Sequence, residues 1–317
     1  MAFYPDTTAT ALRNRLAKLY DISADEIITA NGADNILTLL ISAYINAGDE
    51  VIYCIPTFPS YRSTTLLMGG VPVEVPLTKS WQFDLDGIFS KITAKTKLIF
   101  ICNPNNPTGT MVPSDELKIF LEKVPDHVQV VLDEAYIEYR DQEDYLTGIV
   151  LHKKSYPVIV VRTFSKFYGL AGLRIGYAVA CEDVLEPLLR IREPFAANRI
   201  AIEAAVAALD DEAFGRDHLL EVKKGKDYLT KELSRYGFEV VPSQTNFLFV
   251  NLKTDAVNVF EQLLSKGIII RPCAPWGYPE HVRISVGTQA QNEEFTKAFS
   301  LIATQCINEL MADGGRK

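Results

Sequence analysis

Short apolar runs rich in β-branched residues recur along the first two-thirds of the chain, with helical patterns between them. The runs Lys97–Cys102, Val128–Asp133 and Pro157–Arg162 are typical of strands buried on both faces of a parallel sheet. Strands that alternate with helices predict a doubly wound α/β layer. Arg174–Ala180 has the same pattern and predicts a further parallel strand. We also expect strands at Glu26–Ala30, Glu50–Cys54 and Val71–Val75, and helices at Thr7–Tyr20, Ala33–Ile45 and Pro59–Met68.

The last third of the chain has a different pattern, which predicts an α+β module with its own strands. A helical region near residues 198–236 precedes the other elements, which are strands at Glu239–Val241, Phe247–Asn251, Ile268–Arg271 and His281–Ser285, and helices at Ala256–Ser265 and Asn292–Met311. At roughly 150 residues per domain, a length of 317 residues suggests two domains. We expect a large domain over residues 1–205 and a small C-terminal domain over residues 206–317.

Charge and composition exclude several classes of protein. Acidic residues outnumber basic ones, 40 against 32, and no basic block occurs, which argues against nucleic acid or an anionic membrane as partner. The longest apolar stretches fall short of the roughly 18 residues that span a bilayer. The N-terminal residues lack a secretion signal, and the five cysteines form no CxxC pair, so we expect a cytoplasmic protein with reduced thiols. The four histidines lack metal-ligand spacing, and we expect no metal site.

The segment RTFSKFYGLAGLRIGY is the strongest chemical signal in the chain. A buried strand ends in Thr163 and Ser165, Lys166 follows at once, and Arg174 lies beyond a turn of small residues. The hydroxyls and the guanidinium suit a phosphate, while cationic and apolar surroundings would lower the pKa of the amine so that it can attack a carbonyl. A loop with a solvated lysine and arginine is the alternative from this segment alone.

Two further segments place polar groups at the ends of predicted strands. In Ile28–Leu40, an Asn-Gly turn puts the N–H groups of Ala33 and Asp34 at a helix N-terminus, which is either a phosphate site or an ordinary capped turn. In NPNNPTG, prolines make a rigid loop that presents Asn106 at the ligand-binding edge of the sheet, although Asn-Pro pairs also form plain turns.

The run VVLDEAYIEY delivers an acid to the interior. An unpaired buried carboxylate is very costly, so Asp133 needs a charged partner, and Tyr136 could reach the same ligand. A magnesium-binding aspartate of the Walker B type is the competing interpretation. It lacks its partner motif, because no GxxxxGK[ST] occurs in the chain.

Together these segments resemble the fold-type I, pyridoxal-phosphate-dependent aminotransferases of class II, in the family's order and over almost the whole chain. The motifs PTFPSYR, WQFDLDGI, GIIIRP and VRISVGT make the chain most similar to histidinol-phosphate aminotransferases. The resemblance implies a mixed, mostly parallel large domain with a smaller α+β domain. It also implies transamination between histidinol phosphate and 2-oxoglutarate by a ping-pong mechanism in histidine biosynthesis, with pyridoxal 5′-phosphate as cofactor.

The same resemblance implies roles for individual residues. Lys166 would form a Schiff base with the cofactor and then move a proton, and Asp133 would keep the pyridine nitrogen protonated. Asn106 and Tyr136 would bind the phenolic oxygen, and Phe58 would stack on the ring where the family usually has a tyrosine. The residues that would bind the phosphate are Ala33, Asp34, Thr163, Ser165 and Arg174.

Substrate and subunit contacts follow from the resemblance in the same way. Arg283 matches the arginine that holds the anionic group of the substrate, and Arg271 would add the second charge that a phosphate favours. Taken alone, either arginine could form a surface ion pair. Tyr4 matches a tyrosine that reaches the cofactor phosphate of the neighbouring subunit, which implies a homodimer. The sequence begins after the family's N-terminal arm, and we expect cofactor binding to survive without it and substrate closure to depend on it.

Other functions remain as alternatives at this point. Aromatic amino-acid aminotransferases and threonine-phosphate decarboxylases share the cofactor residues, and a few pocket residues decide between such substrates. A cofactor-binding regulator on this fold would carry a DNA-binding domain, for which the chain lacks length and a basic segment. A dinucleotide-binding oxidoreductase would need GxGxxG after the first strand, and the sequence contains none there.

Overall fold

The computed structural model describes residues 2–141 and 145–314, with side chains of the last helix described as far as residue 302. Contacts divide the chain into two compact units. The first unit comprises Met1–Asn105 and Met111–Gly215, and the second comprises Asn106–Thr110 and Arg216–Lys317. Among the described residues, no helix has both the length and the apolar character needed to cross a membrane.

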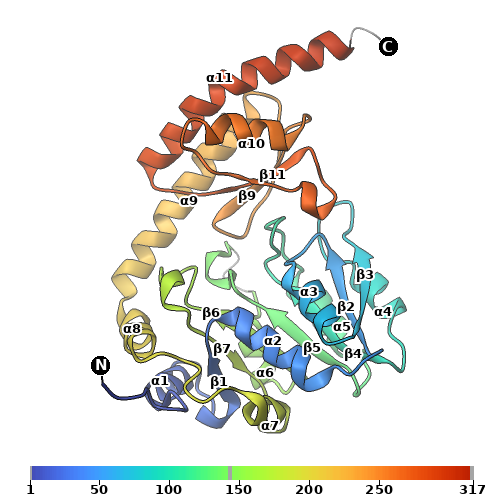
Figure 1. The fold of residues 1–317 in the computed structure, drawn as a ribbon, viewed down its shortest axis with the longest axis vertical. Helices are drawn as coiled ribbons and strands as arrows, with labels where there is room; N and C mark the ends of the chain where they lie inside the picture. The colour runs from blue at the N-terminus through green and yellow to red at the C-terminus, as the bar shows by residue number, and fades with distance from the viewer. Residues whose placement is uncertain (1, 142–144, 315–317) are drawn as a thin grey trace. The chain divides into compact units, whose positions relative to one another are not determined.

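A seven-stranded sheet forms the centre of the first unit, in the order β1-β7-β6-β5-β4-β2-β3 (Figure 1). The strands are β1 (Ile27–Ala30), β2 (Glu50–Ile55), β3 (Val71–Pro76), β4 (Thr96–Cys102), β5 (Gln129–Asp133), β6 (Val158–Thr163) and β7 (Gly176–Val179). From β3 across to β6 the neighbouring strands are parallel. The mixed, mostly parallel α/β fold is therefore confirmed.

One strand runs against the expected direction. The prediction of a parallel strand at Arg174–Ala180 is wrong, because β7 is antiparallel to both β6 and β1. A parallel crossover usually needs a helix that carries the chain back across the sheet. The connection after β6 contains only the short 3₁₀ turn Ala171–Leu173, so the chain returns directly beside β6.

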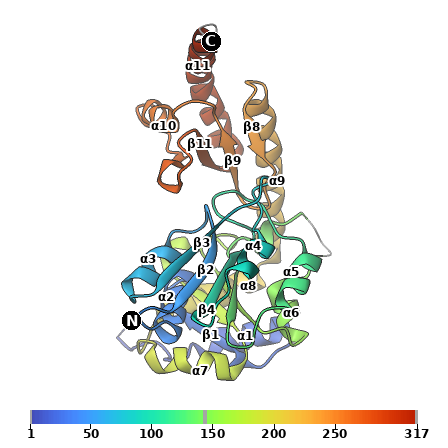
Figure 2. The same cartoon turned by 90° about the vertical axis from the view of Figure 1, so that its right-hand side faces the viewer.

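Helices cover both faces of this sheet. They are α1 (Thr10–Tyr20), α2 (Ala33–Tyr44), α3 (Ser60–Leu67), α4 (Leu85–Ser90), α5 (Ser114–Leu121), α6 (Gly148–Lys153), α7 (Glu182–Ile191) and α8 (Arg199–Asp210). Helices α2 and α3 lie on one side of the sheet, and α4, α5 and α6 lie on the other (Figure 2). The strands between them are almost completely buried, as their apolar runs predict, and they form the core of the unit.

The second unit has an antiparallel sheet in the order β10-β11-β9-β8. Its elements are α9 (Glu212–Ser234), which begins in the first unit, β8 (Glu239–Val241), β9 (Phe247–Asn251), α10 (Ala256–Leu264), β10 (Arg271–Pro272), β11 (His281–Ser285) and α11 (Gln289–Gly314). The strand expected at Ile268–Arg271 is wrong for all but its last residue. Ile269 is 77% exposed, and Pro272 has no N–H to donate to a longer ladder.

Candidate active site

The carboxyl end of β5 carries a buried acid. Asp133 Oδ2 accepts a hydrogen bond from the Tyr61 hydroxyl at 2.6 Å, and Oδ1 accepts one from the Ala135 N–H at 3.2 Å. Burial raises the pKa of Asp133 to about 6, and these hydrogen bonds and the charge of Lys166 offset that effect only in part. A cationic N–H group beside this carboxylate would balance its buried charge.

Lys166 lies beside this acid on the loop that follows β6. Its Nζ is 5.5 Å from the centroid of the Tyr136 ring, within the range of a cation–π contact. Tyr136 is buried, whereas Lys166 is half-buried. The structure thus brings Asp133, Tyr136 and Lys166 together at the ends of two neighbouring parallel strands, where α/β sheets bind ligands.

An anion-binding cradle is built at the N-terminus of α2. Arg174 Nη2 lies 3.3 Å from Asp34 Oδ2, and its Nη1 donates to Ser165 Oγ at 3.4 Å. The Ser165 N–H in turn donates to Thr163 Oγ1 at 3.0 Å. Two hydroxyls, a guanidinium and the free N–H groups of the first turn of α2, which includes Ala33, are therefore gathered in one place.

The backbone around this cradle is fitted closely to Arg174. Gly32 has φ +85°, and a Cβ at this position would lie 2.5 Å from Arg174 Nη2. A Cβ at Gly176 would lie 2.5 Å from the Ala33 nitrogen. Arg174 itself has φ 55°, a left-handed conformation that costs free energy for a residue with a Cβ. Glycines are needed at both positions so that the guanidinium and the helix N-terminus can approach each other.

The second unit holds a pair of arginines on its sheet. Arg271 and Arg283 are directly opposite each other in the antiparallel pairing of β10 and β11, so their side chains leave the same face. Arg283 Nη1 donates to Asn106 Oδ1 at 2.6 Å, while its buried Nε has no hydrogen-bond partner in the part of the chain that the structure describes. The Arg271 guanidinium lies 5.6 Å from the centroid of the Trp276 ring. Like charges placed opposite each other repel, and an anion bound between them would relieve that repulsion.

Comparison with known proteins decides the family. The model of the family aminotransferase class I and II matches residues 1–299. The chain belongs to this family. The histidinol-phosphate aminotransferase of Moorella thermoacetica is 44% identical over 297 residues, which are 93% of this chain and 77% of that protein. Histidinol-phosphate aminotransferase 2 of Carboxydothermus hydrogenoformans is 41% identical over 301 residues, covering 95% of this chain and 83% of that protein.

One solved structure that is similar to this aminotransferase contains a bound cofactor. The histidinol-phosphate aminotransferase of Sinorhizobium meliloti, in complex with pyridoxal-5′-phosphate, matches with a TM-score of 0.89 and 30% sequence identity. The match covers 97% of this chain and 83% of that one. The cradle at Gly32 and the buried carboxyl of Asp133 fit a cofactor that carries both a phosphate and a cationic ring nitrogen.

Two features of this aminotransferase site were not singled out in the sequence. Tyr61, which donates to Asp133, is fully buried, and its ring is stacked on Phe100 with centroids 4.6 Å apart. The half-buried ring of Phe58 meets Tyr61 edge-on at 5.8 Å. The only signal for Tyr61 was its place three residues after Phe58 at the start of a helix. The second feature is the ion pair of Glu134 with Arg162, whose partners lie far apart in the sequence.

Tyr4 lies apart from these groups. Its side chain is exposed, its ring stacks on Phe195 with centroids 4.6 Å apart, and its carbonyl accepts a hydrogen bond from Arg199. Phe3 and Ile200, which adjoin Tyr4 and Arg199 in the sequence, are also exposed. Among the side chains that the structure describes, in residues 2–141 and 145–302, no group of three or more histidine, cysteine, aspartate or glutamate residues could hold a metal ion.

Proposed function

We propose that this aminotransferase transfers the amino group of histidinol phosphate to 2-oxoglutarate, with pyridoxal 5′-phosphate as its cofactor, as a step of histidine biosynthesis. The observation that carries the proposal is the 44% identity, over 93% of the chain, to a protein named for this activity. The complex of the Sinorhizobium meliloti relative with pyridoxal-5′-phosphate supports the assignment of this cofactor.

Three residues of the first unit would handle charge and protons. When bound, the cofactor supplies an aldehyde that joins amines and a ring that accepts electrons. Asp133 holds a proton on the ring nitrogen, because a buried carboxylate is stabilised by a cationic N–H. Lys166 holds the cofactor through Nζ and afterwards moves a proton at the substrate α-carbon. Tyr136 and Asn106 would each donate a hydrogen bond to the phenolic oxygen.

The cradle at α2 would hold the phosphate. The residues proposed to bind it are Ala33, Asp34, Thr163, Ser165 and Arg174. Backbone N–H groups at a helix N-terminus and a guanidinium both favour a dianion, so the cradle fixes the cofactor at the end opposite to Asp133. Phe58 would cover the ring with an aromatic face.

Arg283 and Arg271 would bind the anionic group of the substrate. The planar fork of Arg283 suits both the phosphate of histidinol phosphate and a carboxylate of glutamate, which bind in turn. Its buried Nε donor, which has no hydrogen-bond partner among the described residues, supports this role. Arg271 supplies a second positive charge, which a phosphate uses more than a carboxylate does.

A homodimer in the cytoplasm is the proposed working form. The exposed aromatic surface around Tyr4 supports a subunit contact through which Tyr4 reaches the neighbouring cofactor phosphate. A monomeric mass in analytical ultracentrifugation would contradict it. We also propose that residues 1–205 form the cofactor domain and residues 206–317 the small domain.

The near-visible absorbance of the protein purified with pyridoxal phosphate tests the proposed reaction. We expect a band that is missing from Lys166→Ala and that changes when glutamate or histidinol phosphate is added. Absence of the band from the unaltered protein would overturn the cofactor assignment. A band that ignores histidinol phosphate but responds to another amine would overturn the substrate assignment.

A further inference from the structure

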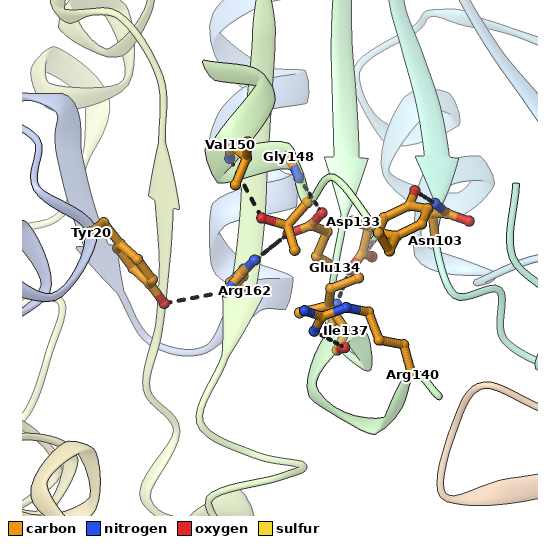
Figure 3. Close-up of polar contacts among 12 residues, drawn as sticks. Tyr20, Asn103, Asp133, Glu134, Ile137, Arg140, Gly148, Val150 and Arg162 are labelled. Atoms are coloured by element: carbon orange, nitrogen blue, oxygen red, sulfur yellow. Dashed lines mark hydrogen bonds and ion pairs between the residues drawn. The ribbon is translucent and has the colours of Figure 1, made fainter. Parts of the chain in front are cut away.

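A buried ion pair joins β5 and β6 beside the proposed cofactor residues. Arg162 Nε and Nη2 donate to Glu134 Oε2 at 2.9 and 2.6 Å, and the side chains are 8% and 2% exposed, respectively. The other oxygen, Glu134 Oε1, accepts the backbone N–H of Gly148 at the start of α6. Figure 3 shows Glu134 held between Arg162 and Gly148. A buried charge pair is retained with little strain only where each partner is hydrogen-bonded, as here.

The pair lies on the face of the sheet opposite to Asp133. Asp133 is paired in register with Val161, and the Glu134 N–H donates to the Val161 carbonyl at 2.9 Å. Because side chains alternate along strands, Asp133, Val161 and Thr163 point to one face, while Glu134 and Arg162 point to the other. Each member of the ion pair therefore directly adjoins, along the chain, a residue proposed to bind the cofactor.

Other groups hold Arg162 from its far side. Its Nη1 donates to the Tyr20 hydroxyl at 3.2 Å, and that hydroxyl lies 2.5 Å from the Tyr177 hydroxyl. Tyr20 lies on this far side in Figure 3. Burial raises the pKa of the nearby Glu138 to about 7, so Glu138 carries only part of a negative charge near neutral pH. These contacts fix one rotamer of Arg162 and with it the end of β6.

We propose that the Glu134–Arg162 pair is a positioning element that locks the ends of β5 and β6 together and so sets the separation of Asp133 and Lys166. The inference rests on the proposed function, because it takes these two residues to hold opposite parts of one cofactor. Neither Glu134 nor Arg162 touches the proposed site directly. Their effect is transmitted through the backbone of Asp133 and of Thr163–Lys166.

The test compares E134Q and R162K with R13K in the otherwise unaltered chain. The R162K variant keeps the charge but loses the planar fork, and it carries the test if E134Q yields no folded protein. R13K is the matched control, because the fork of Arg13 binds the Ala24 carbonyl and Asp25 in the same unit, away from β5 and β6. For each protein we would measure thermal stability, the Kd for pyridoxal phosphate, and the pH at which the near-visible band of the bound cofactor changes.

We expect E134Q and R162K to bind the cofactor about tenfold or more weakly and to shift the pH of the band, since small misplacements of reacting groups have large effects. R13K should lose stability while both cofactor readouts stay unchanged. If E134Q and R162K lose only stability, the pair has a structural role and the inference is wrong. Absence of the Lys166-dependent band from the unaltered protein would overturn the proposed function itself and the inference with it.

Discussion

At the scale of single residues, the charge of Asp133 is costly to the protein before any cofactor binds. Burial raises the pKa of Asp133 to about 6 from an ordinary 3.8, so the folded state binds this proton more tightly than the unfolded state. The folded protein is therefore destabilised as pH rises from about 4 to about 6, by roughly 3 kcal/mol from this group. We predict that cofactor-free Asp133→Asn is more stable than the unaltered protein at pH 7.5, by about 1–3 kcal/mol.

Denaturant unfolding between pH 4 and pH 8 measures this effect. Between pH 4 and pH 6 the stability of Asp133→Asn should also decrease less than that of the unaltered protein, because the contribution of Asp133 to this decrease is absent. Asp34→Asn is the matched control, because Asp34 is exposed and its neutralisation should change stability by less than about 1 kcal/mol. Lower stability of Asp133→Asn at pH 7.5 would contradict the prediction. Weaker cofactor binding by the same protein would show that the acid is kept for function at the expense of stability.

Individual residues of the site differ in how far sequence alone could find them. Asp133 and Lys166 stand at the ends of apolar strands within distinctive motifs, and the structure makes those two strands, β5 and β6, neighbours in the sheet. Their roles at a cofactor stay a prediction. Tyr61 and the Glu134–Arg162 pair were not predicted, because their partners become neighbours only when the sheet forms. A single sequence does not show which acidic side chain a buried tyrosine or arginine will contact.

At the scale of elements, the turn before α2 determines whether Arg174 can face the helix N-terminus. We predict that Gly32→Ala weakens pyridoxal-phosphate binding about tenfold or more, because the new Cβ would displace the guanidinium from the phosphate cradle. Gly48→Ala is the matched control, since Gly48 also has a positive φ, +89°, but has nothing within 4 Å of an added Cβ. Both substitutions should cost roughly 1–3 kcal/mol of stability, because each places a residue with a Cβ at a positive φ. Titration of cofactor absorbance separates them, and equal Kd values would refute the role of Gly32.

The strand boundaries predicted from the apolar runs agree with the structure where a strand lies in the middle of a sheet. The runs that became β4, β5 and β6 are fully covered, so their sequence pattern and their burial agree. The prediction failed where pairing partners decide the outcome. Ile268–Ile270 has strand-forming residues but is not paired, and β7 reverses direction because its connection is short. Strand propensity describes a fit to a pleated surface and does not supply the partner strand.

At the scale of the whole molecule, one loop from the middle of the chain belongs with the C-terminal unit. Asn106–Thr110 groups with Arg216–Lys317, and the Gln244 N–H donates to the Gly109 carbonyl at 2.7 Å. Asn106 also accepts the hydrogen bond of Arg283. The division into residues 1–205 and 206–317, which follows chain order, stays a prediction. Composition and chain order could not have placed this loop, because its partners are more than a hundred residues away.

The net charge of the whole chain bears on how an anionic substrate is attracted. The chain has a formal net charge of -8, so anions are held by local groups such as the opposed pair Arg271 and Arg283 rather than by the overall field. We predict that Arg271→Gln raises KM for histidinol phosphate about tenfold and leaves KM for glutamate nearly unchanged, because a phosphate uses the second charge and a carboxylate does not. Arg283→Lys should raise both values, since a point charge replaces a fork used by both substrates.

Steady-state kinetics with each substrate varied in turn would separate these roles. Arg235→Gln is the matched control, because it removes one positive charge just after the end of α9, where Arg235 pairs with Glu232, and should change neither KM. Equal rises in both KM values for Arg271→Gln would mean that Arg271 supports Arg283 across the β10–β11 pairing and does not select the phosphate. If Arg271→Gln changes neither KM, then Arg283 binds the substrate anion without help from Arg271. The second charge of the phosphate would then be bound by backbone groups or by the cofactor cradle.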